Sequence, residues 1–238
     1  MEKLELIYHG NAKKVFKSMN EDELIIEYTD EVSAFNGVKR ANIENKGIIS
    51  SEISNIIFEY LKNNGIKTHY IKKIDNRNVL VKKVDIIRLE FIVRNIVAGN
   101  MANIICIEEG SVLKEPILEI NYKNDSLGDP LINDNYALAL ELINKKELEY
   151  AYNQVSNINK LLTRLFKKIN LILVDFKVEL GFDKDGVIIL ADEFSPDNAR
   201  LWDTKTKCKY DKDVFRRDLG DIYTAYLEVL NRLKTLDI

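Results

Sequence analysis

Short apolar runs separated by polar breaks fill most of the first half of the chain, a pattern typical of antiparallel strands. The runs are rich in Ile and Val, which favour a pleated, half-buried surface. They predict strands at residues 4–9, 15–17, 24–28, 68–74, 79–84 and 86–98. One helix interrupts them, because apolar residues follow residues 50–52 at spacings of three and four until the stop signal Asn63-Asn64-Gly65.

The second half has longer elements in a different order. Residues 115–134 are predicted to form a loop, because they hold Pro116, Gly128, Pro130 and several Asn and Asp residues. Residues 133–170 predict two helices with a break near Asn144. After them the sequence predicts strands at 171–179 and 187–193 joined by a hairpin turn at 183–186, a loop at 195–213 and a helix at 219–236.

Strands and helices in separate blocks, without strict alternation, indicate an α+β chain. The loop at 115–130 is the best boundary between two lobes, and it divides residues 1–114 from residues 115–238. No internal repeat is apparent.

Composition narrows the class of protein. The 238 residues are 46% hydrophobic and 31% charged, with a formal net charge of -3, so most of the chain is globular and not disordered. A protein that coats nucleic acid usually needs a basic surplus, so the balanced charge of this chain argues against that class. Cys106 and Cys208 are far apart in the sequence and do not look like a disulfide framework, which favours a reducing compartment. No apolar run is long enough for a membrane span, and the first residues lack the apolar run of a signal peptide, so we expect a cytoplasmic protein.

Three segments break the patterns that packing alone produces, and the first is Tyr8-His9-Gly10-Asn11-Ala12-Lys13. A strand, a glycine turn and lysines leading into a second strand can form a lid whose backbone N–H groups face phosphates. The alternative is a solvated hairpin with surface lysines, which is the commoner role of lysine.

The second segment runs from Glu90 to Asn100. Glu90 and Arg94 are four residues apart, so a strand places them on one face. Ala98-Gly99 allows close approach of the backbone to a ligand, and the planar fork of an arginine suits phosphate. The alternative is an ion pair that serves only the fold.

The third segment gives the strongest signal. Asp175, Lys177 and Glu179 alternate with apolar residues, so one face of the strand carries charge. Counting back from the hairpin turn places Glu179 close to Asp192 or its neighbour Glu193. Carboxylates brought together repel each other unless a cation lies between them, and Mg²⁺ with phosphate oxygens would fill that place. The alternative is a solvated sheet face with salt bridges.

Other candidates are weaker. His9 and His69 are isolated and share no metal spacing, so both are predicted to be structural, with ligand contact as the alternative for His69. Trp202 is predicted to anchor its loop by packing, with Arg200 as a candidate for the cleft. The chain lacks the GxSxG, Walker A and GxGxxG motifs.

At these residues the sequence resembles the phosphoribosylaminoimidazole-succinocarboxamide synthase, or SAICAR synthetase, family. The resemblance runs nearly end to end. Its most specific part is the pair Asp-x-Lys-x-Glu at 175–179 and Asp-Glu-x-Ser-Pro-Asp at 192–197. The other matching motifs are Tyr8-His9-Gly10-Asn11-Ala12-Lys13, Ser33-Ala34-Phe35-Asn36-Gly37, Val93-Arg94-Asn95, Ala98-Gly99, Arg200-Leu201-Trp202-Asp203, Asp211-Lys212-Asp213 and Phe215-Arg216.

The resemblance implies a two-lobe α+β fold in which an antiparallel N-terminal sheet and a larger C-terminal lobe enclose ATP, as in protein kinases and ATP-grasp enzymes. It implies a ligase that joins the carboxylate of carboxyaminoimidazole ribonucleotide to the amine of L-aspartate, with ATP and Mg²⁺, through an acyl phosphate in purine biosynthesis. It also implies a homodimer.

Residue roles follow from the resemblance too. The residues that would hold ATP are Gly10, Asn11, Ala12, Lys13, Val15, Val81 and Lys82, with adenine against the strand end at 81–83, and Mg²⁺ would be bound by Glu179 and Asp192. Arg94 and Arg200 would hold the ribonucleotide phosphate. The rest of the substrate site would comprise Glu90, Asp175, Lys177 and Asp197, with Asn36, His69, Lys212 and Arg216 as further candidates. The expected catalytic residues are Asp175, Lys177 and Glu179.

The chain departs from the family pattern at a few positions. Asn11 stands where the family usually has a second lysine, which removes one phosphate-facing charge. Asn100 replaces a usual serine, and its amide can still donate to phosphate. Neither change removes a predicted metal ligand, so we expect an active enzyme.

Two other functions stay open at this point. A small-molecule kinase would use the same ATP site, although the chain lacks the His-Arg-Asp and Asp-Phe-Gly elements of protein kinases. A non-catalytic nucleotide sensor is less consistent with Lys177, Glu179 and Asp192. The segment 121–130 is a candidate wall for the aspartate site.

Overall fold

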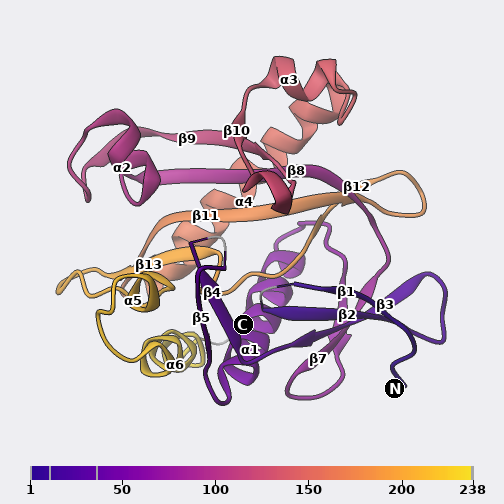
Figure 1. Cartoon of the computed structure of the whole chain (residues 1–238), viewed down its shortest axis with the longest axis horizontal. Helices are drawn as coiled ribbons and strands as arrows, with labels where there is room; N and C mark the ends of the chain where they lie inside the picture. Colours follow the sequence, from indigo (N-terminus) through magenta and orange to yellow (C-terminus); the bar gives the residue numbers. More distant parts are fainter. Residues whose placement is uncertain (1, 11, 36, 237–238) are drawn as a thin grey trace.

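The computed structural model describes residues 2–10, 12–35 and 37–236, and Figure 1 shows the whole arrangement. A five-stranded antiparallel sheet forms most of the N-terminal lobe. Its strands, in spatial order, are β1 (Leu6–His9), β2 (Lys13–Lys17), β3 (Glu23–Tyr28), β7 (Asn78–Lys82) and β6 (Tyr70–Lys73). A separate hairpin of β4 (Glu31–Ala34) and β5 (Lys39–Asn42) follows β3. The predicted strands of this half are confirmed, but the β4–β5 hairpin was not predicted.

Helix α1 (Lys46–Asn63) packs against the five-stranded sheet through Ile49, Ile53 and Ile57. It begins four residues before the predicted start at residue 50. The reason is a distant cap, because the Asp30 carboxylate accepts a hydrogen bond of 2.9 Å from the Gly47 N–H. Gly47 is required there, since a Cβ would lie 2.6 Å from the carbonyl oxygen of Tyr28.

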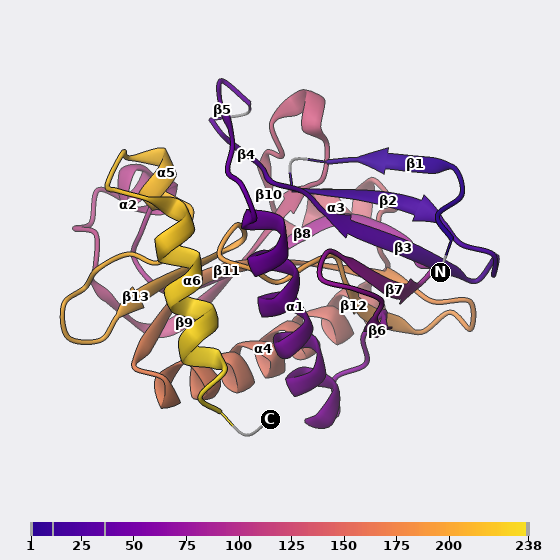
Figure 2. The ribbon, with the colours of Figure 1, turned by 90° about the horizontal axis from the view of Figure 1, so that it is seen from below.

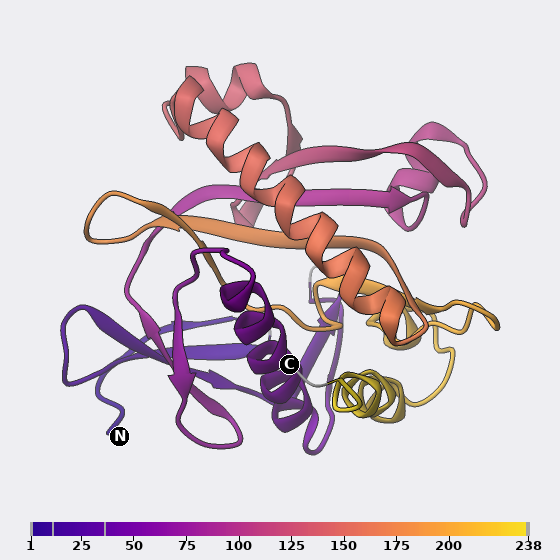
Figure 3. The same ribbon diagram turned by 180° about the vertical axis from the view of Figure 1, so that it is seen from behind.

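A six-stranded antiparallel sheet forms the centre of the other lobe. Its strands are β10 (Leu131–Ile132), β9 (Val112–Tyr122), β8 (Asp85–Ile96), β11 (Leu171–Phe182) and β12 (Ile188–Ala191), with β13 (Ala199–Asp203) also paired to β11. Helix α4 (Lys145–Lys168) crosses the back of this sheet (Figure 3). The Asn144 side chain caps α4, and α3 (Asp134–Ala139) precedes it, so the predicted pair of helices is confirmed.

The predicted loop at 115–134 is wrong over its first half, because β9 continues to Tyr122. Pro116 misled the prediction, since proline cannot donate to a ladder. The structure tolerates Pro116 because the pairing of β8 with β9 is irregular just there, and β10 pairs only with Ile120 and Asn121. The chain passes from the five-stranded to the six-stranded sheet between Lys82, where β7 ends, and Asp85, where β8 begins. The lobe boundary expected after residue 114 falls inside β9.

The last quarter also holds elements that were expected to be a loop. Strand β13 interrupts residues 195–213, and helix α5 (Asp213–Arg216) begins at the end of that range. Nearer the middle of the chain, the short helix α2 (Asn100–Ile105) follows β8 and was not predicted. Helix α6 (Ile222–Leu233) begins three residues later than predicted. The reason is its cap, since the Asp221 carboxylate accepts hydrogen bonds from the N–H groups of Tyr223 and Thr224.

One continuous apolar core joins the two lobes. Residues 67–69 pair with Leu190 of β12, which links the N-terminal lobe directly to the six-stranded sheet. Helices α1 and α6, from opposite ends of the sequence, lie side by side (Figure 2). No helix in the described part of the chain is long and apolar enough to cross a membrane. The result is the two-lobe α+β arrangement that the resemblance implied.

Candidate active site

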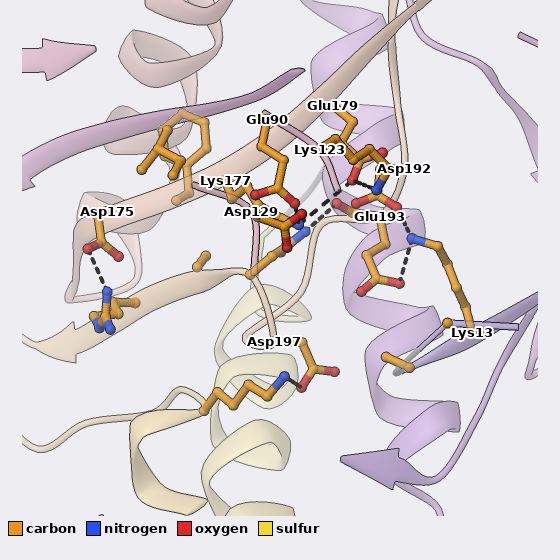
Figure 4. A pocket seen from close by; sticks show the side chains of 18 of the residues that line it. Lys13, Glu90, Lys123, Asp129, Asp175, Lys177, Glu179, Asp192, Glu193 and Asp197 are labelled. Carbon is orange, nitrogen blue, oxygen red and sulfur yellow. Dashed lines mark hydrogen bonds and ion pairs between the residues drawn. The ribbon is translucent and has the colours of Figure 1, made fainter. Parts of the chain in front are cut away.

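A charged cavity of about 320 Å³ lies between the lobes, over the face of the six-stranded sheet opposite α4 (Figure 4). Its lining comes from β1 and β2, from β8 and β11, and from the segments after β9, β12 and β13. The charged side chains in it are Lys13, Glu90, Arg94, Lys123, Asp125, Asp129, Asp175, Lys177, Glu179, Asp192, Glu193, Asp197, Arg200, Lys212 and Arg216. We call this cavity the cleft.

Strand β11 supplies the centre of the cleft in the way its alternation predicts. Asp175, Lys177 and Glu179 all line the cavity, while Val178 and Leu180 belong to the apolar core. Strand β8 lies beside it with Arg94 opposite Asp175 and Glu90 opposite Glu179. Two neighbouring strands therefore bring five predicted residues onto one face.

Arginines gather at one end of the cleft, around Asp175. The Oδ2 atom of Asp175 accepts hydrogen bonds from Arg94 Nη1 (2.9 Å) and Arg200 Nη1 (2.8 Å). Arg94 also donates to Glu119 Oε2 through Nε and Nη2 at 3.0 and 2.8 Å, and Arg200 donates to Asp213 Oδ2 through Nε at 3.0 Å. Each guanidinium is held by two carboxylates, so its orientation is fixed. We call Arg94, Asp175 and Arg200, with Glu119 and Asp213, the arginine end.

Lysines gather at the other end, where each pairs with carboxylates as a point charge. Lys177 donates to Glu90 Oε1 at 2.5 Å, and Lys123 donates to Glu179 Oε1 at 2.6 Å. Lys13 contacts Asp192 closely and lies 3.5 Å from Glu193 Oε2. We call this set the lysine end, and its members are Lys13, Glu90, Lys123, Lys177, Glu179, Asp192 and Glu193. Figure 4 shows Asp175 of the arginine end on one side and Lys13 and Asp192 of the lysine end on the other.

The lysines keep Glu179 ionised although it is buried. Burial would raise the pKa of Glu179, but the charges of Lys177, Lys123 and Lys13 lower it below its usual value. Burial raises the pKa of Glu90 despite its bond to Lys177. The pKa of Lys177 is raised, because Glu179 and Glu90 outweigh burial, so Lys177 stays protonated and acts as a cation and not as a base.

Two carboxylates suit a hard divalent cation better than a transition metal. Among residues 2–10, 12–35 and 37–236, no three His, Cys, Asp or Glu side chains are grouped to hold a metal by themselves. Glu179 and Asp192 both line the cleft. Mg²⁺ is usually held by one or two carboxylates together with phosphate oxygens, so this donor set fits Mg²⁺ that arrives with a nucleotide.

A second, apolar cavity of about 260 Å³ opens next to the lysine end. Val15, Leu24, Ile26 and Val81 come from three adjacent strands of the five-stranded sheet, and His69 and Lys82 also line the cavity. The two cavities share Tyr8, Lys13, Lys123, Glu179 and Asp192. A flat apolar group in this pocket would therefore place a polar tail among the lysines.

His69 enters this pocket as a neutral side chain. It is 4% exposed, and burial lowers its pKa to about 3. Its ring lies 5.3 Å from that of Phe58. It can contact a ligand only as an uncharged group.

Known proteins share both the sequence and the fold. The sequence model of SAICAR synthetase matches residues 6–233. A phosphoribosylaminoimidazole-succinocarboxamide synthase from Finegoldia magna is 52% identical over 231 residues, which cover 97% of this chain and 100% of that protein. The crystal structure of the synthase from Ehrlichia chaffeensis has a TM-score of 0.95 at 40% identity, covering 98% of this chain and 100% of that one. The chain belongs to the SAICAR synthetase family.

A SAICAR synthetase in complex with ADP is similar as well, with a TM-score of 0.93 at 43% identity over 96% of this chain and 97% of that one. The family predicted from the motifs at 175–179 and 192–197 is thus confirmed.

In this member of the SAICAR synthetase family, most predicted site residues meet in the two cavities. Gly10, Ala12, Lys13, Glu90, Arg94, Asp175, Lys177, Glu179, Asp192, Asp197, Arg200, Lys212 and Arg216 line the cleft. Val15, Val81, Lys82 and His69 line the apolar pocket. Asn11 and Asn36 lie outside the described residues.

Asn100 is the exception among the described candidates, because it is exposed at the start of α2 and lines neither cavity. The preceding Gly99 lies against a side chain of the cleft. Its φ of 56° suits glycine, and a Cβ there would lie 2.4 Å from Arg200 Nη2. Gly99 thus makes room for an arginine of the cleft.

Sequence reasoning assigned no role to Lys123, Asp125 or Asp129, although all three line the cleft. They follow β9 in the segment expected only as a candidate wall. Recognising β9 as a strand would have found Lys123, since its N–H bonds to the carbonyl of Arg88 on the neighbouring β8. Asp129 has a φ of 49° between a glycine and a proline, which reads from sequence as a plain turn.

Proposed function

We propose that the protein uses ATP to join the carboxylate of carboxyaminoimidazole ribonucleotide to the amine of L-aspartate, giving SAICAR, ADP and phosphate. The observation that carries this proposal is the cleft, where buried carboxylates and lysines at one end face paired arginines at the other. Membership of the SAICAR synthetase family over residues 6–233 supports the same reaction.

ATP would place adenine in the apolar pocket and its phosphates at the lysine end. Val15, Ile26 and Val81 offer an apolar floor, and Lys82 at the end of β7 lies beside it. Lys13 and Lys123 lie where the two cavities meet, so both can exchange a carboxylate partner for a phosphate oxygen. The similar SAICAR synthetase in complex with ADP supports the binding of a nucleotide.

Mg²⁺ would be held by Glu179 and Asp192. When bound, it would neutralise charge on the transferred phosphoryl group. Glu179 is kept ionised by three lysines and is therefore ready to accept a cation.

The ribonucleotide phosphate would bind at the arginine end. Arg94 and Arg200 are held by carboxylates in fixed orientations, which suits a planar fork that must meet phosphate oxygens. Asp175 holds both guanidiniums at the same time, and this makes it a positioning residue for the pair.

The chemistry then takes two steps between the ends of the cleft. One oxygen of the substrate carboxylate attacks the terminal phosphorus of ATP, its bond to ADP breaks, and an acyl phosphate forms. The aspartate amine attacks the acyl carbon, loses a proton, and expels phosphate with the original carboxylate oxygen. Lys177 lies 2.5 Å from Glu90 and 3.7 Å from Glu179, so it can stabilise negative charge at the reacting carboxylate.

L-Aspartate would enter along the segment after β9. Lys123, Asp125 and Asp129 line that side of the cleft. A lysine can pair with a substrate carboxylate, and aspartates can accept hydrogen bonds from its amine.

A turnover assay separates this function from its two alternatives. The protein is mixed with ATP, Mg²⁺, the carboxyaminoimidazole ribonucleotide and L-aspartate, and ADP and SAICAR are measured with and without aspartate. SAICAR that depends on aspartate supports the ligase. ADP with a stable phosphorylated ribonucleotide and no need for aspartate would identify a kinase, and binding without turnover would identify a sensor.

Homodimer formation stays a prediction from the resemblance, and a cytoplasmic location stays a prediction from the sequence. Sedimentation equilibrium of the purified chain tests the first, with a mass of twice 27.5 kDa as the expected result.

A further inference from the structure

A buried ion pair lies behind the cleft wall, between the two ends of the sequence. Lys46, the first residue of α1, is 0% exposed, and its Nζ lies 2.5 Å from Asp197 Oδ2. The same Nζ donates to the Glu31 carbonyl at 3.1 Å. Lys46 thus attaches the cleft residue Asp197 to the N-terminal lobe.

A tyrosine from α6 holds the other oxygen of the same carboxylate. The hydroxyl of Tyr226 donates to Asp197 Oδ1 at 2.9 Å, and Tyr226 is itself 0% exposed. Lys46 Nζ lies 5.9 Å from the centre of the Tyr226 ring. Lys212 is the next cation, with its Nζ 4.0 Å from Asp197 Oδ1.

These contacts fix both the charge and the direction of the carboxylate. Burial would raise the pKa of Asp197, but Lys46 and Lys212, with hydrogen bonds from Lys46 and Tyr226, lower it below its usual value. Without them a buried carboxylate would take up a proton or turn away. The Asp197 side chain is only 4% exposed, so protein groups supply most of its partners.

We propose that Lys46 and Tyr226 are positioning residues that act through Asp197 on binding of the ribonucleotide. This inference rests on the proposed function, with Asp197 as one of the cleft residues that the family resemblance assigns to the ribonucleotide site. Neither Lys46 nor Tyr226 lines the cleft, so any effect on the substrate must pass through the carboxylate they hold. The carboxylate in turn reaches the cleft from the turn that follows β12.

Positioning of Asp197 by Lys46 and Tyr226 can be distinguished by measurement from contacts that serve only the fold. A structural pair would change the fraction of folded protein and leave each Michaelis constant as it was. A positioning pair changes the KM of one substrate and leaves the KM of ATP unaltered. It also loses its effect once Asp197 no longer carries a charge.

The test is a double-mutant cycle of Tyr226→Phe and Asp197→Asn, with kcat and the KM of each substrate measured for every variant. Tyr226→Phe should raise the KM of the ribonucleotide about tenfold, the usual effect of a lost hydrogen bond to a charged group. The KM of ATP should change less than about twofold. In the Asp197→Asn background, Tyr226→Phe should change the KM of the ribonucleotide less than about twofold.

Tyr60→Phe is the matched control, because the Tyr60 hydroxyl donates to the Leu161 carbonyl at 3.3 Å and lines neither cavity. Equal ribonucleotide KM values for Tyr226→Phe and Tyr60→Phe would overturn the inference. So would a full tenfold effect of Tyr226→Phe in the Asp197→Asn background.

Lys46→Met extends the test to the cation. Removing one partner of a buried pair is costly, so this variant can fail to fold, and the cycle with Tyr226 then decides alone. If Lys46→Met folds, its ribonucleotide KM should rise at least as much as that of Tyr226→Phe, and an unchanged KM would exclude Lys46 from the pair.

Ribonucleotide affinity, measured by calorimetry without ATP, separates the two proposals. If the wild-type protein makes SAICAR and the cycle is additive, only this inference fails. A wild-type protein that neither binds the ribonucleotide nor makes SAICAR would overturn the proposed function and this inference with it.

Discussion

The two ends of the cleft carry similar numbers of charges but hold them differently. At the arginine end, Arg94 and Arg200 share one oxygen of Asp175, and each has a second carboxylate partner. At the lysine end, Lys123 has a single bond to Glu179, and Lys13 lies between two carboxylates. Arginine makes a fixed fork, whereas lysine is a point charge on a flexible stem.

The difference matches what each end would bind. A ribonucleotide phosphate does not react, so a rigid site that holds it in one place costs nothing in the chemical step. The terminal phosphate of ATP moves from one oxygen to another during the reaction. Cations that can change partners are suited to follow that charge.

The largest effect should come from removing the charge of Glu179. In Glu179→Gln we expect kcat with Mg²⁺ to fall at least about a thousandfold, because a neutral amide cannot take the place of a carboxylate ligand. The ribonucleotide should still bind with wild-type affinity, since the arginine end is untouched.

Calorimetry with the ribonucleotide and a steady-state assay measure the two quantities. Glu27→Gln is a control of the same chemistry, because Glu27 pairs with Lys3 outside the cleft. Wild-type turnover in Glu179→Gln would remove Glu179 from the metal site.

An exchange of cation type sharpens the comparison. Arg200→Lys keeps the charge but loses the fork that bonds Asp175 and Asp213, so the KM of the ribonucleotide should rise about a hundredfold. Lys123→Arg keeps a charge beside Glu179 and should change the KM of either nucleotide less than about tenfold.

Steady-state kinetics with each substrate varied in turn give both values. Comparable losses in the two variants would mean that the ends do not differ in the way proposed.

Much of the cleft was predictable because the alternation of side chains along a strand depends only on neighbouring residues. The alternation of Asp175, Lys177 and Glu179 with apolar residues gave their common face, and the hairpin turn fixed the register. The structure pairs Glu179 with Ala191, one residue from Asp192. Local rules were sufficient there, since turn length and side-chain alternation determine both facts.

The rest depends on contacts between distant parts of the chain. Lys46 reads as an ordinary lysine before a helix, yet its partner Asp197 lies 151 residues away. Strand β9 was missed because Pro116 is acceptable only where the pairing with β8 is irregular. The prediction for Asn100 followed a motif, and the turn of α2 directs that residue outward.

The smallest expected effect is on the stability of the fold, whose pH dependence has opposite signs for a carboxyl beside the arginine end and for one at the lysine end. Burial and the charge of Asp213 raise the pKa of Asp211, beside the arginine end, to about 7. The folded protein then keeps a proton that the unfolded chain loses above about pH 4, so this group lowers stability as pH rises toward 7. Glu179 has the opposite sign, since its lowered pKa stabilises the fold above its usual range and that contribution is lost in acid.

Thermal unfolding between about pH 5 and pH 8 checks the sign. The fall in Tm with rising pH should be smaller by a few degrees in Asp211→Asn than in the wild-type protein. An identical slope in the two proteins would mean that Asp211 titrates normally.

The most direct test of the account follows one oxygen atom. Carboxyaminoimidazole ribonucleotide labelled with ¹⁸O in its carboxylate is turned over with ATP and L-aspartate, and the phosphate released is analysed by mass spectrometry. If the substrate carboxylate attacks ATP and an acyl phosphate carries the reaction, each phosphate contains one ¹⁸O atom. Phosphate without ¹⁸O would mean that water receives the phosphoryl group, and the proposed use of the cleft would be wrong.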